Sequence, residues 1–419
     1  MINSHRNQRQ RNQKHGGREQ RQLPLRPTCL SLALMAVFAI AQADEPDTLQ
    51  FRVGESIQTN SNVFRLSDSV NTQAVTGRNE RSDTIAVTTV GVKFNKAYSL
   101  QRFELDAEAQ DYRYQRYSNI SFTAANYAAA WRWSLTPALH GNVTTDRRDY
   151  VDNTADVQNI GRVNHRTERN SLADAEYELG ARWRVLGGFF DRSSRNSQPA
   201  TFILDNRVSG AEGGFKYVFR ENDNVSYRYR SGRGNYLNQP LAAGASRDFN
   251  DREHEFRAQW QLTGSNFVQG RLSRFERRQD SQPARSFSGY RGEINSNWEF
   301  TGKTSLAAGL IKELDSYQTN LESYFDGYRV FVAPTYKATE KIAVKFRYEQ
   351  GTRTFKGANV GFAPSGRRDS LRLASLGVEY QALRSLTLAA ALQRDQRSSN
   401  IPGFDYRNNS VFVSGLFKF

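Results

Sequence analysis

The sequence of 419 residues contains one cysteine, five histidines and no long run of apolar residues. A membrane-spanning helix needs roughly 20 mostly apolar residues in succession, so the sequence excludes a helical membrane protein. The single cysteine, Cys29, lies in an N-terminal segment that has the features of a removable leader. Without that segment the chain has no thiol, which excludes disulfide bonds, thiolate catalysis and zinc sites built on cysteine.

The first 43 residues predict a secretory signal peptide. Residues 1–26 carry seven Arg and Lys against one Glu, residues 30–40 are uncharged, and Ala41, Gln42 and Ala43 follow. A basic segment, an apolar segment of about 7 to 15 residues and a small-x-small ending are typical of a signal peptide. We therefore expect cleavage after Ala43 and a single domain over residues 44–419.

Groups that carry enzyme chemistry are sparse. The histidines outside the leader are His140, His165 and His254, and none has the spacing of a metal ligand. The sequence has no G-x-S-x-G nucleophile elbow, phosphate-binding loop or calcium loop. We expect a protein that is not an enzyme and that binds neither cofactor nor metal. The alternative is a barrel hydrolase or acyltransferase with a Ser and a His from distant strands.

Aromatic residues are abundant, with 26 Phe, 19 Tyr and 5 Trp in a chain that is only 38% hydrophobic. Many of them alternate with polar residues: Tyr227 and Tyr229, for example, alternate with Arg228 and Arg230. A period of two is that of a β-strand with one apolar and one polar face. The chain after the leader shows this period almost throughout, and we predict an all-β protein.

Short turns and long polar stretches separate the alternating segments. Longer polar stretches include 151–167, 238–250 and 356–369. Short periplasmic turns and long surface loops are typical of outer-membrane barrels. Eight short turns, with both chain ends on their side, predict a transmembrane antiparallel β-barrel of about 18 strands in the outer membrane of a Gram-negative bacterium. The turns are expected at 96–99, 136–138, near 184, and at 221–224, 263–266, 301–304, 338–341 and 382–385.

All five tryptophans lie near the short turns: Trp131, Trp133, Trp183, Trp260 and Trp298. Tryptophan prefers the interface between membrane and water, because its ring is apolar at one end and polar at the other. We therefore predict a periplasmic aromatic girdle. The alternative is a soluble β-sandwich with these rings in its core, but core tryptophans have no reason to follow one kind of turn.

The C-terminal segment alternates up to an aromatic last residue. Val411, Val413, Gly415, Phe417 and Phe419 share one face. This looks like the β-signal that outer-membrane barrels present to their assembly machinery. We therefore expect Phe417 and Phe419 to be the assembly signal, on a last strand that closes the barrel against the first.

The polar strand positions are rich in arginine, with 11 Lys and 47 Arg in the whole chain. Arginine binds carboxylates and phosphates bidentately. One interpretation is a lumen that contacts an anionic or hydroxyl-rich solute through Arg132, Arg182, Arg228, Arg230, Arg257, Arg271, Arg347 and Glu349. The other is structural, and pairs these arginines across neighbouring strands with Glu176, Glu178, Glu293, Glu299 and Glu349. The loops at 151–167 and 356–369 are the candidates for narrowing the pore.

Several short segments resemble the EpsL-type outer-membrane proteins of exosortase and exopolysaccharide gene clusters, a branch of the β-barrel porin 2 family. They are the stretch NVFRL at 62–66, YSLQRF at 98–103, YRYQRY at 112–117 and YAAAWRWSLTP at 127–137, followed by the C-terminal segment. The resemblance implies an outer-membrane barrel that takes part in exopolysaccharide biosynthesis or export. It implies no catalytic residue.

The sequence thus supports one principal function and two alternatives. The principal one is exopolysaccharide export, with the polymer or its export proteins as partners. The alternatives are a general porin for small polar or anionic solutes and a barrel scaffold that conducts nothing. Further expected partners are outer-membrane lipid, lipopolysaccharide and the barrel-assembly machinery. Nucleic acid is not expected, because the basic residues form neither a patch nor a stripe.

Overall fold

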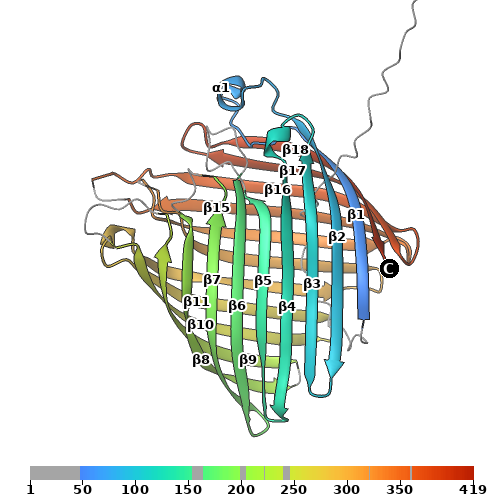
Figure 1. The fold of residues 1–419 in the computed structure, drawn as a ribbon, viewed down its shortest axis with the longest axis vertical. Helices are drawn as coiled ribbons and strands as arrows, with labels where there is room; N and C mark the ends of the chain where they lie inside the picture. Colours follow the sequence, from blue (N-terminus) through green and yellow to red (C-terminus); the bar gives the residue numbers. More distant parts are fainter. Residues whose placement is uncertain are drawn as a thin grey trace, which may run out of the picture.

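The computed structural model describes residues 48–152, 164–198, 204–220, 222–238, 246–319, 321–358 and 361–419. The predicted signal peptide lies outside these residues. Within them the chain forms one antiparallel sheet of 18 strands that closes on itself (Figure 1), so the predicted fold class and strand number are confirmed. In the same residues no helix is both long and apolar enough to cross a membrane.

The strands follow the chain around the barrel, each bonded to its neighbours in sequence. Their bounds are β1 Thr48–Asn60, β2 Asp83–Tyr98, β3 Gln101–Tyr114, β4 Phe122–Thr136, β5 Leu139–Asp152, β6 Asn164–Leu179, β7 Trp183–Asn196, β8 Asn206–Arg220, β9 Asp223–Tyr236, β10 Asp248–Thr263, β11 Asn266–Arg278, β12 Phe287–Glu299, β13 Thr304–Ser316, β14 Tyr324–Lys337, β15 Ile342–Lys356, β16 Arg368–Gln381, β17 Leu386–Ser399 and β18 Tyr406–Lys418.

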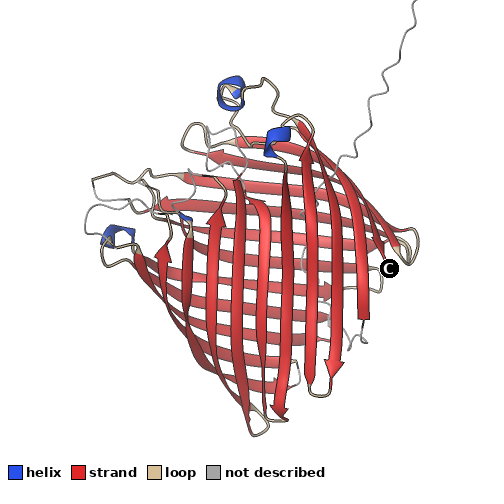
Figure 2. Cartoon of the chain, viewed as in Figure 1, coloured by secondary structure: helices blue, strands red, loops and turns tan. Residues whose placement is uncertain are grey.

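One end of the barrel carries short turns and the other carries long loops (Figure 2). Each of the eight predicted turns falls within a few residues of a connection between consecutive strands, from the β2–β3 turn to the β16–β17 turn. Three short helices of the described residues lie among the loops: α1 Thr72–Thr76, and the 3-10 helices η1 Ser118–Ile120 and η4 Pro283–Arg285. The end with the long loops is the extracellular one by the rule for outer-membrane barrels.

β1 pairs with both β2 and β18, and this double pairing closes the barrel. The last residue takes part, because Phe51 N donates to Phe419 O at 2.7 Å and Phe419 N donates to Phe51 O at 3.0 Å. The two rings stack with centroids 5.8 Å apart. No strand edge between β1 and β18 is left open to lipid, which cannot satisfy backbone hydrogen bonds. The role of Phe417 and Phe419 in assembly stays a prediction.

The alternation seen in the sequence sorts the side chains into an outer and an inner wall. On β10, Phe256 points outward and is 55% exposed, whereas its neighbours Glu255 and Arg257 point inward and share an ion pair. The predicted tryptophan positions are confirmed, since all five occupy outward-facing strand positions near the turn end. The barrel therefore has an apolar outer wall and a polar inner wall.

The loop between β1 and β2 packs against the inner wall at the loop end. Its residues Val63, Phe64 and Leu66 are buried in one cluster with inward-facing side chains of β2, β3, β4 and β18. Asn62 fixes the turn, because its Oδ1 accepts from Leu66 N at 3.0 Å and its Nδ2 donates to Leu66 O at 2.8 Å. We call residues 62–66 the elbow; they are the NVFRL segment of the family resemblance.

The elbow is thus an inward-packed loop that the sequence did not indicate. Of the two loops predicted to narrow the pore, residues 153–163 of the first lie outside the described residues. In the second, Arg367 is buried between the rings of Phe355 and Phe404, with its guanidinium 4.0 Å from each centroid, and it donates to Asp369. These contacts tie the second loop to its neighbours, and its role as a constriction stays a prediction.

Candidate functional site

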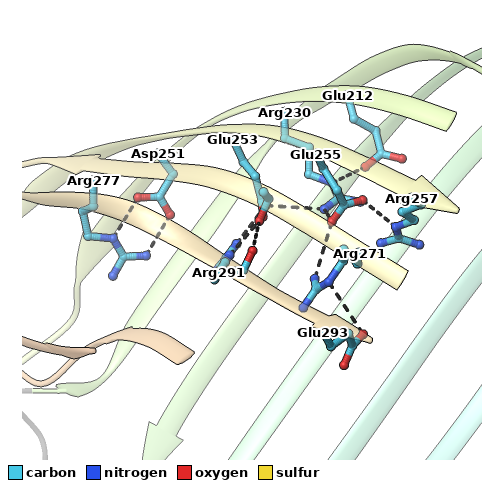
Figure 3. Close-up of polar contacts among 11 residues, drawn as sticks. Glu212, Arg230, Asp251, Glu253, Glu255, Arg257, Arg271, Arg277, Arg291 and Glu293 are labelled. Atoms are coloured by element: carbon cyan, nitrogen blue, oxygen red, sulfur yellow. Dashed lines mark hydrogen bonds and ion pairs between the residues drawn. The ribbon is translucent and has the colours of Figure 1, made fainter. Parts of the chain in front are cut away.

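A network of arginines and carboxylates covers the inner wall of β8 to β12 (Figure 3). Arg230 lies at its centre on β9. Its Nε donates to Glu212 Oε2 at 2.5 Å, and its Nη1 lies 3.2 Å from Glu255 Oε2 and 3.4 Å from Glu253 Oε2. All four side chains are buried although they face the lumen. One cation thus holds three carboxylates from the strands on both sides of it.

Each of these carboxylates also binds a second arginine. Glu255 accepts from Arg257 at 2.5 Å and from Arg271 at 3.5 Å. Glu253 accepts two bonds from Arg291, at 2.8 and 2.9 Å. The resulting chain of alternating charge runs along the barrel circumference across five strands, and such networks hold their members in fixed positions.

A second, separate pair lies nearer the loop end of the same wall. Arg277 donates two bonds to Asp251, at 2.7 and 2.8 Å. Its guanidinium lies 3.9 Å from the ring centroid of Phe249 and donates to Tyr236 Oη at 3.1 Å. This arginine is buried and fully partnered, so it is a structural element of the wall.

Inward-facing glycines on β8 and β9 let the strands approach closely beside the network. A Cβ at Gly214 would lie 2.0 Å from Tyr227 O, and one at Gly210 would lie 2.1 Å from Ser231 O. A side chain fits at neither position. The glycines leave the space on this wall to the long side chains of the neighbouring strands, Arg228 and Arg230 among them.

Next to the network the lumen contains a cavity of about 600 Å³. Six of the seven arginines that line it occupy inward-facing positions, against four acidic residues, so the inward-facing part of the lining has an excess of two positive charges. The arginines are Arg166, Arg192, Arg230, Arg277, Arg291 and Arg353, and the acidic residues are Glu168, Asp251, Glu253 and Asp315. A narrow polar space with one sign of charge in excess attracts ions of the opposite sign.

Arg192 differs from the other arginines of this cavity. It lies over the ring of Phe190, with the guanidinium 5.1 Å from the centroid, and within the described residues it forms no ion pair. Arg230 and Arg291, which line the same cavity, have carboxylate partners. Arg192 is therefore the cation of this wall whose guanidinium is open to a solute.

The predicted solute-contact residues are mostly on the inner wall, but they are not one site. Arg228, Arg230, Arg257 and Arg271 are together in the network. The others are Arg132 on β4, bound to Glu104 at 2.8 and 3.0 Å, and Arg347 and Glu349 on β15, joined at 2.7 Å. All of these arginines have carboxylate partners. Their contact with a solute stays a prediction.

Arg182 is the exception, because the structure does not place it on the inner wall. It lies in the turn between β6 and β7, and its Nη1 donates to Tyr217 Oη at 3.0 Å. Tyr217 pairs with Trp183 on the outer wall. Arg182 comes directly before β7, in the turn that reverses the chain, where the alternation of the strand does not apply.

Four of the five predicted glutamates form ion pairs, but of these pairs only that of Glu293 with Arg271 joins a predicted arginine across neighbouring strands. The pairs are Glu176 with Lys216 at 2.6 Å, Glu178 with Arg184 at 3.1 Å, Glu293 with Arg271 at 3.7 Å and Glu349 with Arg347 at 2.7 Å. In the described part of the chain, Glu299 has no ion pair. The sequence interpretation missed the most buried members, Glu212, Glu253 and Glu255. The same alternation that marked Arg257 as inward marks Glu253 and Glu255.

Among the described residues, no three His, Cys, Asp or Glu side chains converge as a metal ion requires. The expected absence of cofactor, metal and enzyme activity stays a prediction.

Comparisons with known proteins agree with this architecture. The sequence model of a family described as "Putative beta-barrel porin 2" matches residues 275–419. A search of curated proteins found no match. Among solved structures, a BenF-like porin from Pseudomonas fluorescens Pf-5 has a TM-score of 0.51 at 12% identity, covering 88% of this chain and 99% of that one. OccK1 (OpdK) of Pseudomonas aeruginosa has a TM-score of 0.49 at 14% identity, with the same coverage of 88% and 99%.

The fold is that of an outer-membrane porin. The closed sheet, with its apolar outer wall and its girdle of tryptophans, places the protein in the outer membrane of a Gram-negative bacterium, which confirms the predicted location. The association with exosortase clusters rests on the sequence resemblance alone.

Proposed function

We propose that the barrel conducts small anionic solutes across the outer membrane. The observation that carries this proposal is the charge of the lumen cavity, whose inward-facing arginines outnumber its acidic residues by two. Barrels of 16 to 18 strands leave an aqueous channel. An anion in this channel meets a fixed excess of positive charge beside the buried network.

The path lies along one side of the lumen. The elbow covers the inner wall of β2, β3 and β18, and the network covers β8 to β12. In the order of the strands β1 and β10 are nine places apart in a ring of 18, so these two walls face each other. The apolar elbow therefore narrows the lumen from one side and leaves the charged wall to the solute.

Arg192 is the residue that we expect to contact the solute. The paired arginines offer a solute weak contacts only, because their hydrogen bonds to carboxylates are already formed. A conducting site has to release its solute as readily as it binds it, and one open guanidinium among paired ones meets this requirement.

Planar-bilayer recording of the refolded protein tests the proposal. In a salt gradient the wild-type reversal potential should show a preference for anions, and Arg192→Glu should weaken or reverse it. Arg195→Glu is the matched control, because Arg195 lies on the same strand but faces outward. Absence of channel opening at all voltages would refute conduction, and equal shifts in both variants would refute the role of the cavity.

Export of an exopolysaccharide is the second candidate. It is favoured by one observation: the NVFRL segment of the family resemblance is the elbow, which packs against the inner wall at the extracellular mouth. Deletion of the gene should then abolish extracellular polysaccharide, and re-expression should restore it. If the strain without the gene still makes the same amount of extracellular polysaccharide, export is refuted. The general porin then remains as the function.

A further inference from the structure

A second cavity, of about 350 Å³, lies on the outer wall of the barrel. We call it the outer-wall pocket; its lining residues are Tyr229, Arg252, His254, Arg274 and Glu276. All of them occupy outward-facing positions, because they alternate with network residues such as Arg230 and Glu253 that face the lumen. The pocket therefore opens toward the membrane, and it shares the lining residue Arg252 with the lumen cavity.

The outer wall changes from apolar to charged at the level of the pocket. One row nearer the turn end, Phe256 and Leu272 lie opposite each other and are each 55% exposed. At the pocket, His254 lies opposite Arg274. One row nearer the loops, Arg252 lies opposite Glu276. The pocket thus joins an apolar surface on one side to a cationic surface on the other.

The row of the pocket nearest the loops, Arg252 and Glu276, lies near the headgroup layer of the outer leaflet. Trp260 of the periplasmic girdle and Arg252 are on the same strand, eight residues apart. Eight residues extend about 27 Å along a strand, and a strand tilt of about 40° reduces this to about 21 Å along the membrane normal. The apolar band of such barrels is about 25 Å tall. Arg252 therefore lies close to the plane where acyl chains end and headgroups begin.

The cations of the pocket are open to a ligand. In the described part of the chain neither Arg252 nor Arg274 has an ion pair, and Arg274 lies 5.9 Å from the ring centroid of Tyr290. The one carboxylate, Glu276, is already bound by Arg278. An arginine that stacks on a ring keeps its donors for a planar or tetrahedral anion.

We propose that the outer-wall pocket binds the phosphate of an outer-leaflet glycolipid of the lipopolysaccharide type. Arg252 and Arg274 bind the phosphate, for which the guanidinium is the preferred side-chain partner. Phe256 and Leu272 then contact the acyl chains that descend from the same lipid. A free phosphate ion fits the arginines alone, whereas an acylated phosphate fits both surfaces, which is why the lipid is the ligand that we assign.

Native mass spectrometry of the full chain refolded in detergent tests this assignment. The probe is a purified bisphosphorylated lipid A, compared with the same lipid after enzymatic removal of its phosphates. The wild type should retain the phosphorylated lipid, and loss of the phosphates should weaken binding about a hundredfold, as expected for two charge-assisted contacts. Equal binding of the two lipids would overturn the proposal without any variant.

Two double variants locate the site. Arg252→Gln with Arg274→Gln should weaken binding of the phosphorylated lipid by a similar factor. Arg372→Gln with Arg394→Gln removes two exposed, outward-facing cations of β16 and β17, far around the barrel, and should leave binding unchanged. Equal losses in both would show diffuse surface charge and overturn the pocket. Full displacement of the lipid by millimolar inorganic phosphate would assign the pocket to the free ion and overturn the lipid.

Discussion

Removal of Arg230 is the sharpest test of the buried network. The change Arg230→Met keeps most of the side-chain volume but leaves Glu212, Glu253 and Glu255 without their common cation. Removing one partner from a buried ion pair costs about 3 to 5 kcal/mol. Each of these carboxylates keeps a second arginine, and only the contact with Glu212, at 2.5 Å, is short. We therefore expect a loss near the lower limit, about 3 kcal/mol.

The measurement is urea unfolding of the protein refolded into lipid vesicles, followed by tryptophan fluorescence. The slope of the unfolding free energy against urea concentration should be the same in the wild type and the variant, which shows that both unfold by the same mechanism. Arg207→Met is the matched control on β8, because its pair with Asp191 at 2.9 Å is exposed, with 62% and 38% of the two side chains accessible. An exposed pair contributes about 0 to 1 kcal/mol. Equal losses in the two variants, or no loss for Arg230→Met, would refute the reasoning.

Three further changes test the wall itself. Phe346 lies in the outward apolar row of β15, and Phe346→Arg should lower the free energy of unfolding by about 2 to 4 kcal/mol in the same assay. Its control Lys345→Gln breaks an inward ion pair with Glu379 and should lower it by less than about 1 kcal/mol. Gly214→Ala should destabilise the barrel by about 1 to 3 kcal/mol, because its Cβ would lie 2.0 Å from Tyr227 O, while Gly213→Ala has room and should be neutral. Deletion of Phe419 should slow assembly in cells, measured as the fraction of unfolded chain on a gel, because it removes two backbone bonds to β1.

The strands and their faces could be predicted because both depend on local information. The side chains of a strand in a membrane barrel alternate every two residues, and a turn within a hairpin needs only a few polar residues. The strand number could therefore be predicted from local features such as the alternation around Tyr227 and the turn at 263–266. The tryptophans added the membrane boundary, because their preference for the interface is a property of the side chain itself.

The partners on the inner wall could not be predicted in the same way. Alternation states that Arg230 and Glu255 face inward, but the register between β9 and β10 decides that they meet, and that register is a property of the closed barrel. The elbow has the same origin. Phe64 is buried by residues that lie far along the chain, among them Phe412, and no local pattern shows such a contact.

The close pairing within the network explains why so much charge can be buried in a channel. Open water on every side would screen the charges, and paired arginines would then contribute little. The network on β8 to β12 is compact enough that Arg230 and its three carboxylates cover one another from water. The same arrangement leaves Arg192 as a cation without a carboxylate beside arginines that are paired. An anion that enters the cavity therefore responds chiefly to this one residue, which is why a single charge reversal there is expected to change the selectivity of the whole pore.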